Sequence, residues 1–403
     1  MQVMTMGWGG GPVQGLKRKT TYQFPAKPVE ARQVFYTPRT QHHWIHDVAS
    51  LPKFDSTHID RQDCGGESVM SVVDRVTGED GANDDIVLLF LDNLVWPILL
   101  VTFVAFGLLL PESFFSSRNI EFLLLSGAAI GMLALGESIC LLSGHFDLSV
   151  GSIAGFSAMA TALIMTQWFP GMSGIAGIVL ILVIGGSIGL LNGVSVGYLG
   201  VNPFLQTLAF YIIFRGGTIA ASTYPISDLP ESYLYVGGGD IVNGVPFAVL
   251  VLFASFALVG YVLKYQPFGL SIYAVGGNEQ ASRESGIDTK KVILAVYILS
   301  GVFSALGGLL FTGFLGAATP SLGENQMFPA FAAAIIGGIS IFGGRGNIVG
   351  ALGGVLLLGT IEAGLVMLQV QPTLIRMTNG IILLGAILLY TGIEKYRKAK
   401  LQV

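Results

Sequence analysis

Four charged side chains lie where the sequence is otherwise apolar, and they are its strongest candidates for chemistry. They are Glu137, Asp147, Arg215 and Glu362. A charge in a hydrocarbon environment is costly, so such a residue generally pairs with another group, caps a helix or lines a path for ions and solutes. We therefore treat the four as candidates for a transport pathway or for helix packing.

Each of the four also has a structural interpretation. Asp147 can cap the helix that follows it, where its charge opposes the positive end of the helix dipole. Arg215 can bind a carbonyl or a carboxylate from a neighbouring helix, or serve in the pathway. Glu362 and Arg376 flank one turn and can pair with each other. Glu137 is either a protonated, hydrogen-bonded side chain or a group lining a wet cavity, and the sequence leaves both open.

Hydrolytic chemistry finds little support in the sequence. No G-x-x-x-x-G-K-[ST] phosphate loop is present, and GGNEQ at 276–280 has no lysine placed to reach a nucleotide. His145 is the only histidine after His58, and no serine-centred elbow lies near it. We predict that the chain is not an enzyme and that any energy comes from partner proteins or an ion gradient.

A metal site is also not expected. The histidines of HHWIHD (His42, His43 and His46) can bind a transition metal in principle, but a flexible polar tail is the simpler interpretation. Cys64 and Cys140 make neither a disulfide framework nor a paired metal site. We predict no metal and no cofactor.

Composition indicates a membrane protein. Of the 403 residues 52% are apolar and 11% charged, with a mean hydropathy of +0.69, too few charges to surround a soluble core. Residues 1–85 hold 9 of the 21 Lys/Arg and 11 of the 25 Asp/Glu. We expect a polar, flexible cytoplasmic extension at 1–85, a transmembrane domain at 86–394 and a basic cytoplasmic tail at 395–403. A net charge of −4 offers no basic face for nucleic acid.

Apolar runs predict an all-α polytopic fold of about ten transmembrane helices. A bilayer core about 30 Å thick needs roughly 20 apolar helical residues. The fifth and eighth runs are short and broken by glycine, so each is a candidate half-helix. The ten runs are Ile86–Leu110, Phe122–Ser143, Leu148–Trp168, Ile175–Leu199, Phe204–Ala221, Val245–Leu263, Val292–Leu315, Met327–Phe342, Ile348–Leu368 and Leu374–Tyr390.

Basic residues predict the orientation, because loops on the cytoplasmic side are enriched in Lys and Arg. They gather in the loop 264–291, at 395–400 and at Arg345. With these inside and an even number of spans, both termini are cytoplasmic. The segment 223–244 carries no Lys or Arg and is expected outside; its acidic residues are Asp228, Glu231 and Asp240.

Glycine spacing predicts close helix packing. The chain has 55 glycines, about twice the usual share of roughly 7%. Small residues every fourth position let helix backbones approach closely in lipid. Such series are Gly185, Gly189, Gly193 and Gly197; Gly346, Gly350 and Gly354; and the pairs Gly127 with Gly131 and Gly151 with Gly155.

Four segments in a fixed order carry a family resemblance. They are GHFDLSVGS at 144–152, NPF at 202–204 followed by Leu208 and RG at 215–216, AVGGNEQASRESGI at 274–287 and GGRGNIVGALGG at 343–354. Together they resemble the permease subunits of bacterial ABC importers for ribose and related monosaccharides, over most of positions 94–394. The chain departs from the family pattern at His145, Phe146, Glu137 and Ile361–Ala363, and these departures leave the sugar open.

The resemblance implies a fold related to that of vitamin B12 permeases and a role for the loop 264–291. There we expect a short helix at Glu279–Ser285, capped by Asn278, that a separate ATPase subunit grips. The resemblance extends the pathway or packing candidates to Ser149, Gly151, Asn202 and Pro203. The coupling-loop residues are Gly276, Gly277, Asn278, Glu279, Arg283, Glu284 and Gly286.

The function implied is a permease of the cell inner membrane that translocates a ribose-like pentose or a hexose. Its partners would be a cytoplasmic ABC ATPase that binds the ATP, an external solute-binding protein and a second permease copy or paralogue, within the lipid bilayer. One alternative keeps this architecture with a nucleoside, branched-chain amino acid or sugar-like signal as cargo. Another is an ion-coupled secondary transporter with Glu137 as the proton-coupled group.

Overall fold

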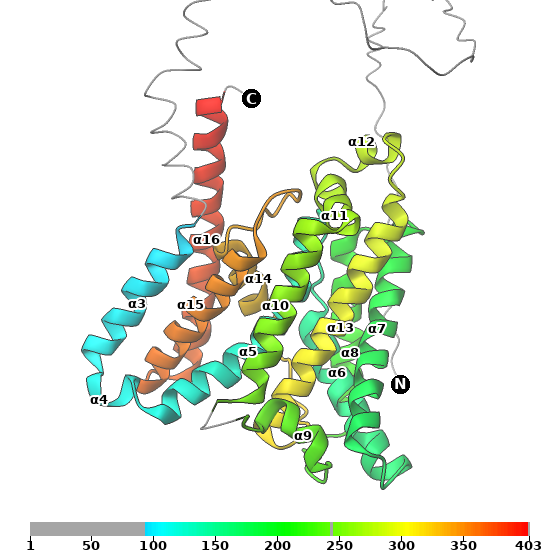
Figure 1. The fold of residues 1–403 in the computed structure, drawn as a ribbon. Coiled ribbons are helices and arrows are strands. Elements are labelled where there is room, and N and C mark those ends of the chain that lie inside the picture. The colour runs from blue at the N-terminus through cyan, green and yellow to red at the C-terminus, as the bar shows by residue number, and fades with distance from the viewer. Residues whose placement is uncertain (1–92, 242–244, 402–403) are drawn as a thin grey trace, which may run out of the picture. The chain divides into compact units, whose positions relative to one another are not determined.

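A computed structural model describes residues 93–241 and 245–401, and the predicted extension at 1–85 with its histidines and Cys64 lies outside them. The described residues form helices and no β-strand, so the all-α expectation is confirmed (Figure 1). A π-helical turn, Ile164–Trp168, continues α6. The helices are α3 (Val95–Leu109), α4 (Pro111–Phe114), α5 (Ser117–Leu142), α6 (Val150–Leu163), α7 (Gly174–Gly197), α8 (Pro203–Ala221), α9 (Glu231–Gly238), α10 (Phe247–Tyr265), α11 (Pro267–Gly277), α12 (Glu279–Glu284), α13 (Thr289–Leu315), α14 (Met327–Ile336), α15 (Ile348–Met367) and α16 (Pro372–Leu401).

Every predicted apolar run overlaps one of these helices. Eight helices of the described chain are long and apolar enough to cross a membrane, and α3 and α14 are shorter. The fifth run forms α8, a continuous helix of 19 residues, so it is not a half-helix. The eighth forms α14, whose 10 residues rise about 15 Å, half of the hydrocarbon core. The basic residues from Lys395 to Lys400 belong to the last turns of α16.

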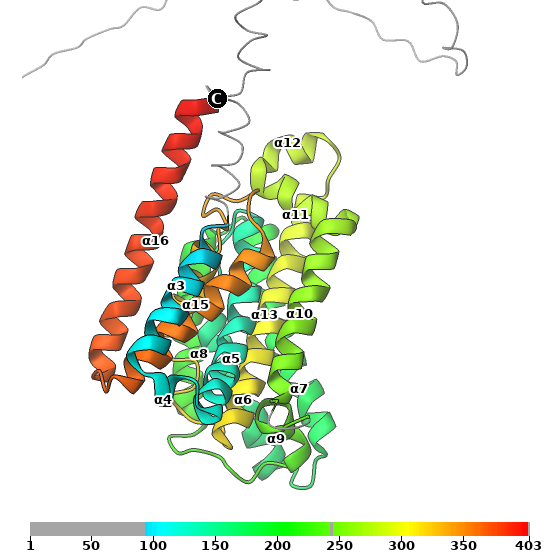
Figure 2. The same ribbon diagram turned by 60° about the vertical axis from the view of Figure 1, so that its left-hand side comes forward.

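The central helix is α5. It packs against α13 on one side and against α14 and α15 on the other, and 83% of its most apolar 18-residue window is buried. Figures 1 and 2 show α7, α10 and α13 in one group, and α3, α15 and α16 in the other. The corresponding window of α16 is only 6% buried, so α16 is peripheral.

Local sequence explains where the helices begin and end. Asn202 caps α8, its Oδ1 accepting the Phe204 N–H at 3.0 Å, and Pro203 occupies the first turn, where no backbone N–H is needed. Gly316, with φ of 69°, ends α13 in a left-handed conformation that glycine adopts without strain. Asn202 thus begins α8, and Gly316 ends α13, close to the bounds predicted from hydropathy.

The four-residue glycine series of α7 packs directly on α13, as predicted. A Cβ added at Gly185 or Gly189 would collide with the backbone of α13, at the carbonyls of Gly301 and Tyr297. At Gly193 it would lie 2.9 Å from the Leu294 Cα. Helix backbones therefore touch along this seam.

The shorter glycine series behave less uniformly. An added Cβ at Gly354 would meet the Ala333 backbone of α14, and one at Gly350 would meet Gly337, the C-cap of α14, so these two glycines form a packing face. A Cβ added at Gly131 would meet the Leu252 side chain, and a Cβ added at Gly127 would meet no described atom within 4 Å. The prediction of a close backbone contact is therefore wrong for Gly127.

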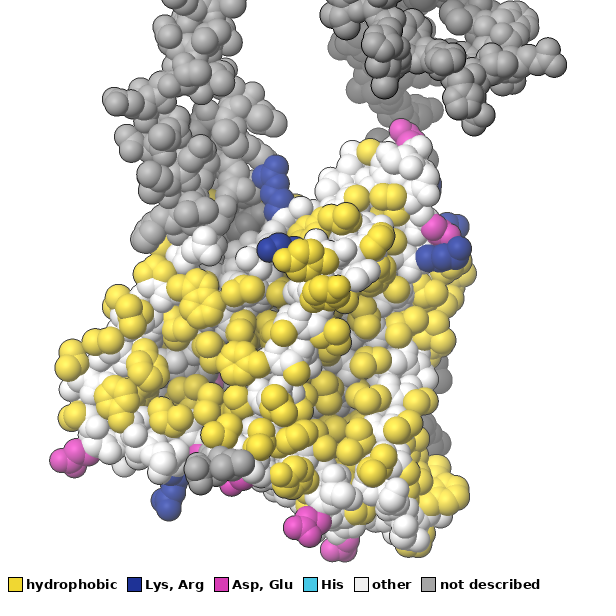
Figure 3. All heavy atoms as spheres, viewed as in Figure 1, with side chains coloured by type: hydrophobic (Ala, Val, Ile, Leu, Met, Phe, Trp, Pro, Cys, Tyr) yellow, Lys and Arg dark blue, Asp and Glu magenta, His cyan; other side chains and the backbone are white. Residues whose placement is uncertain are grey.

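Charge separates between the two ends of the helices. The helix α12 and the C-terminal end of α16 lie at one end, and α4 and α9 at the other (Figures 1 and 2). Figure 3 shows Lys and Arg gathered mainly at the first end and acidic side chains at the second. That the basic end is cytoplasmic stays a prediction from these residues.

Substituting Gly189→Val tests the glycine seam. The valine side chain has no space beside the Tyr297 carbonyl, so the helices must separate, and we expect a loss of about 1–3 kcal/mol typical of overpacking. Thermal unfolding in detergent measures the effect. The control is Gly216→Val on α8, where an added Cβ meets nothing within 4 Å. Equal melting temperatures for the two variants would contradict backbone contact at Gly189.

Candidate coupling surface and buried polar cluster

The predicted capped helix exists at the basic end. The Asn278 Oδ1 accepts the Ala281 N–H at 2.9 Å, which confirms the cap. The helix, α12, runs Glu279–Glu284, and Ser285 is its C-cap rather than its last residue. Gly286 then turns the chain with φ of 89°, a conformation suited to glycine. A rigid, exposed turn of helix therefore connects α11 to α13.

Charged side chains cover α12 and stabilise it. The Arg283 guanidinium contacts the Glu279 carboxylate at 2.6 Å, and the Thr289 hydroxyl donates to the same carboxylate at 3.2 Å. Nearby, Asp288 caps α13 and accepts the Lys291 N–H at 3.2 Å. The Lys291 side chain and backbone hydrogen bonds hold the pKa of Asp288 below its usual value. The exposed pairs fix the shape of this surface more than they add stability.

Three segments that carry the family resemblance meet beneath α12. Gly144, Gly276, Gly343 and Gly344, here called the glycine crossing, bring the ends of α5 and α11 against the loop before α15. The Gly344 N–H donates to the Leu142 carbonyl at 2.9 Å. A Cβ at Gly343 would lie 2.6 Å from the Gly144 Cα and from the Gly276 carbonyl. Side chains have no room at Gly276, Gly343 and Gly344, so the three segments meet through their backbones.

A cavity of about 300 Å³ lies beside the crossing. Its wall includes Phe342, which is 81% exposed, and Arg345. The Tyr273 hydroxyl donates to the Gly346 carbonyl at 3.0 Å and ties α11 to this loop, and burial raises the pKa of Tyr273. Phe342 was not among the site residues predicted from the sequence. The signal available there was an aromatic residue directly before GGRG.

Asp147 is the centre of a buried polar cluster. Its Oδ1 accepts the Ser149 N–H at 3.0 Å and the Ser149 hydroxyl, and its Oδ2 accepts the Ser300 hydroxyl at 2.7 Å. The Asn192 amide donates to the Ser149 oxygen at 3.0 Å. Asp147 thus joins the start of α6 to α13 and, through Ser149, to α7. It braces the turn before α6, whose N-cap is Ser149, rather than capping the helix itself.

Glu137 contrasts with Asp147. It is 1% exposed on α5, and neither carboxylate oxygen makes a hydrogen bond within 3.5 Å among the described residues, although the Asp147 backbone N–H lies near the carboxylate. The adjacent Gly136 packs against the Ser300 backbone of α13. Of the two expectations, a hydrogen-bonded side chain is not observed, and Glu137 lines neither described cavity.

Arg215 has structural partners of both expected kinds. Its guanidinium donates to the Pro320 carbonyl and contacts the Glu324 carboxylate at 2.8 Å. These partners belong to the loop between α13 and α14 rather than to a helix. Arg215 therefore anchors the loop that leads into the half-length helix α14.

The remaining candidates do not form one site. Among the ion pairs of the described residues, none joins Glu362 to Arg376, so that expected pair is wrong; Glu362 is half-buried on α15 and Arg376 is exposed on α16. Gly151 packs against Gly323 and the start of α14. Asn202 caps the N-terminus of α8, and Pro203 is the first residue of that helix.

Comparison with known proteins identifies the family. Residues 119–389 match the family described as branched-chain amino acid transport system / permease component. The chain belongs to this family. It is similar to the D-allose transport system permease protein AlsC of Escherichia coli, with 36% identity over 74% of this chain and 91% of that one. The ribose import permease RbsC of Bacillus subtilis is 36% identical over 70% of this chain and 87% of its own.

A third relative is the L-arabinose ABC transporter permease protein AraH of Azospirillum brasilense, with 30% identity over 75% of this chain and 86% of that one. No solved structure matches the chain. The chain is therefore a polytopic permease component.

Paired amide substitutions separate the roles of the two buried acids. We expect Asp147→Asn to lower the stability by about 1–3 kcal/mol, because it removes the charge that accepts three hydrogen bonds. Glu137→Gln makes the same chemical change where no hydrogen bond exists, so we expect no loss. Thermal unfolding of the two variants measures the difference in their stability. A Glu137→Gln variant as unstable as Asp147→Asn would show that Glu137 is held by partners.

Proposed function

We propose that the chain is the membrane-spanning permease subunit of an ATP-driven importer that translocates a monosaccharide delivered by an external binding protein. The sugar permeases among its relatives support this cargo class. The observation that carries the mechanism is the capped helix α12, exposed above the glycine crossing. A cytoplasmic ABC ATPase binds the ATP and grips α12, and the permease needs no cofactor of its own.

The path of the force follows from the contacts. The helix α12 is joined to α13 by the short turn at Gly286 and by the bond between Thr289 and Glu279. α13 packs along α7 and α5, and these two contacts are the most extensive between the described helices. Closure of the ATPase pushes on α12 and tilts α13 with the helices packed against it. The same push reaches the loop before α15 through Gly276 and Gly344.

The interior suits a neutral cargo. Of the four charged candidates, Asp147 and Arg215 are occupied by structural partners. Glu137 and the half-buried Glu362 are the acids that stay without a described partner, and we assign them to the pathway. Affinity for the sugar resides mainly in the binding protein. A second permease, identical or related, completes the transporter in the cell inner membrane.

The double variant Glu279→Arg with Arg283→Glu tests the coupling. It keeps the ion pair within α12 but reverses the charges offered to a partner. We expect uptake of labelled ribose, or of the sugar preferred by the copurifying binding protein, to fall at least tenfold, equivalent to about 1.4 kcal/mol of lost interaction. The ATPase should copurify poorly.

The matched control is Glu231→Arg on α9, an exposed residue at the opposite end. It should leave copurification of the ATPase unchanged. Normal uptake and normal assembly of the double variant would refute α12 as the docking helix. Competition of uptake by excess allose, arabinose, adenosine or leucine identifies the class of cargo.

One observation favours a second candidate function. The unpartnered carboxyl group of Glu137, buried beside the cluster around Asp147, is the kind of group that couples proton movement to transport. In that case an uncoupler abolishes uptake and loss of the ATPase does not. Uptake that needs the ATPase and survives the uncoupler rejects this candidate.

A further inference from the structure

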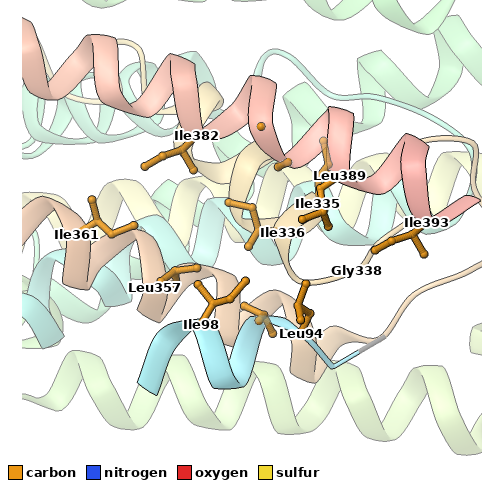
Figure 4. A pocket seen from close by; sticks show the side chains of 13 residues that line it. Leu94, Ile98, Ile335, Ile336, Gly338, Leu357, Ile361, Ile382, Leu389 and Ile393 are labelled. Carbon is orange, nitrogen blue, oxygen red and sulfur yellow. The ribbon is translucent and has the colours of Figure 1, made fainter. Parts of the chain in front are cut away.

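A second cavity, of about 270 Å³, lies between the peripheral helix α16 and the helices α3, α14 and α15. Figure 4 shows side chains from all four helices around it, among them Ile98, Ile336, Leu357 and Leu389. Every lining residue is an aliphatic residue or a glycine. The lining side chains therefore offer no hydrogen-bonding group to a polar ligand.

The cavity opens to the surface of the helix bundle. Ile98 is 40% exposed and Leu389 is 48% exposed although both line it. Small residues on α16 give it depth, since Gly385 and Ala386 face it and a Cβ added at Gly385 would meet nothing within 4 Å. An apolar cavity of about 150 Å³ stays dry and accepts a molecule as large as benzene. This larger one, opening among membrane helices, suits a length of hydrocarbon chain.

Charge next to the cavity selects the kind of lipid. Ile393 lines its end nearest the C-terminus, and Lys395 follows two residues later, exposed on the same helix. The next turns of α16 add Arg397, Lys398 and Lys400. A dense basic segment directly beyond a membrane helix attracts anionic headgroups. The apolar cavity and the basic turns lie at the same end of α16.

We propose that this cavity holds an acyl chain of an anionic phospholipid, whose headgroup is attracted by Lys395 and the basic sequence that follows it. The lipid fills the space between α16 and the bundle, where little of α16 is buried by protein. The site is independent of the cargo and of the ATPase.

Lipid retention tests the proposal. The full chain is reconstituted in vesicles of equal parts phosphatidylglycerol and phosphatidylethanolamine, extracted in mild detergent and measured by native mass spectrometry. We expect wild type to retain phosphatidylglycerol at several times the level of phosphatidylethanolamine. Gly385→Leu and Ala386→Leu fill the cavity and should lose the bound lipid. Gly380→Leu, on the same helix at a site equally free of neighbours but outside the cavity, should retain it.

Neutralising the basic turns completes the design. The combined variant Lys395→Gln, Arg397→Gln, Lys398→Gln and Lys400→Gln should retain both lipids equally. Equal retention by wild type, or unchanged preference in the neutralised variant, overturns the proposal even if a filled variant fails to fold. A change of oligomeric state on filling the cavity would instead assign it to a second copy of the chain.

Discussion

Direct contact between helix backbones is the constraint on which this protein depends. Within a bilayer, apolar side chains gain little by leaving lipid, so helices are held by close packing and by hydrogen bonds. The series from Gly185 to Gly197 brings α7 onto α13, and Gly350 with Gly354 brings α15 onto α14. Backbone atoms of the facing segment are among the nearest neighbours at each of these glycines. This direct contact is what would let the proposed push on α12 reach the helices packed against α13.

Buried charged side chains are likewise held by specific contacts. The Asp147 carboxylate accepts three hydrogen bonds from two segments, and the Arg215 guanidinium contacts a loop carbonyl and the Glu324 carboxylate. Both hold irregular backbone in place where a helix starts within the protein, at α6 and before α14. Glu137 has no side-chain hydrogen-bond partner among the described residues.

Periodicity and composition predicted the helices well, because apolar length is a local property of the chain. The cap at Asn278 and the glycine face of α7 were also predictable, since each depends on neighbouring residues or on one helix surface. The partners of Arg215 were not, because Pro320 and Glu324 lie more than a hundred positions away. Nor was the meeting of Gly144, Gly276 and Gly344, although each lay in a segment that carried the resemblance. The expected pairing of Glu362 with Arg376 failed because flanking a turn does not bring side chains together.

A cytoplasmic ATPase can reach α12 only if the basic end of the bundle faces the cytoplasm, and the accessibility of two engineered thiols measures this orientation. With Cys64 and Cys140 replaced by serine, Gln280→Cys on α12 and Glu231→Cys on α9 provide one exposed thiol at each end. A membrane-impermeant maleimide applied to intact cells should label position 231 alone and should reach position 280 only after the membrane is opened. Labelling of position 280 in intact cells would place α12 outside and contradict the account.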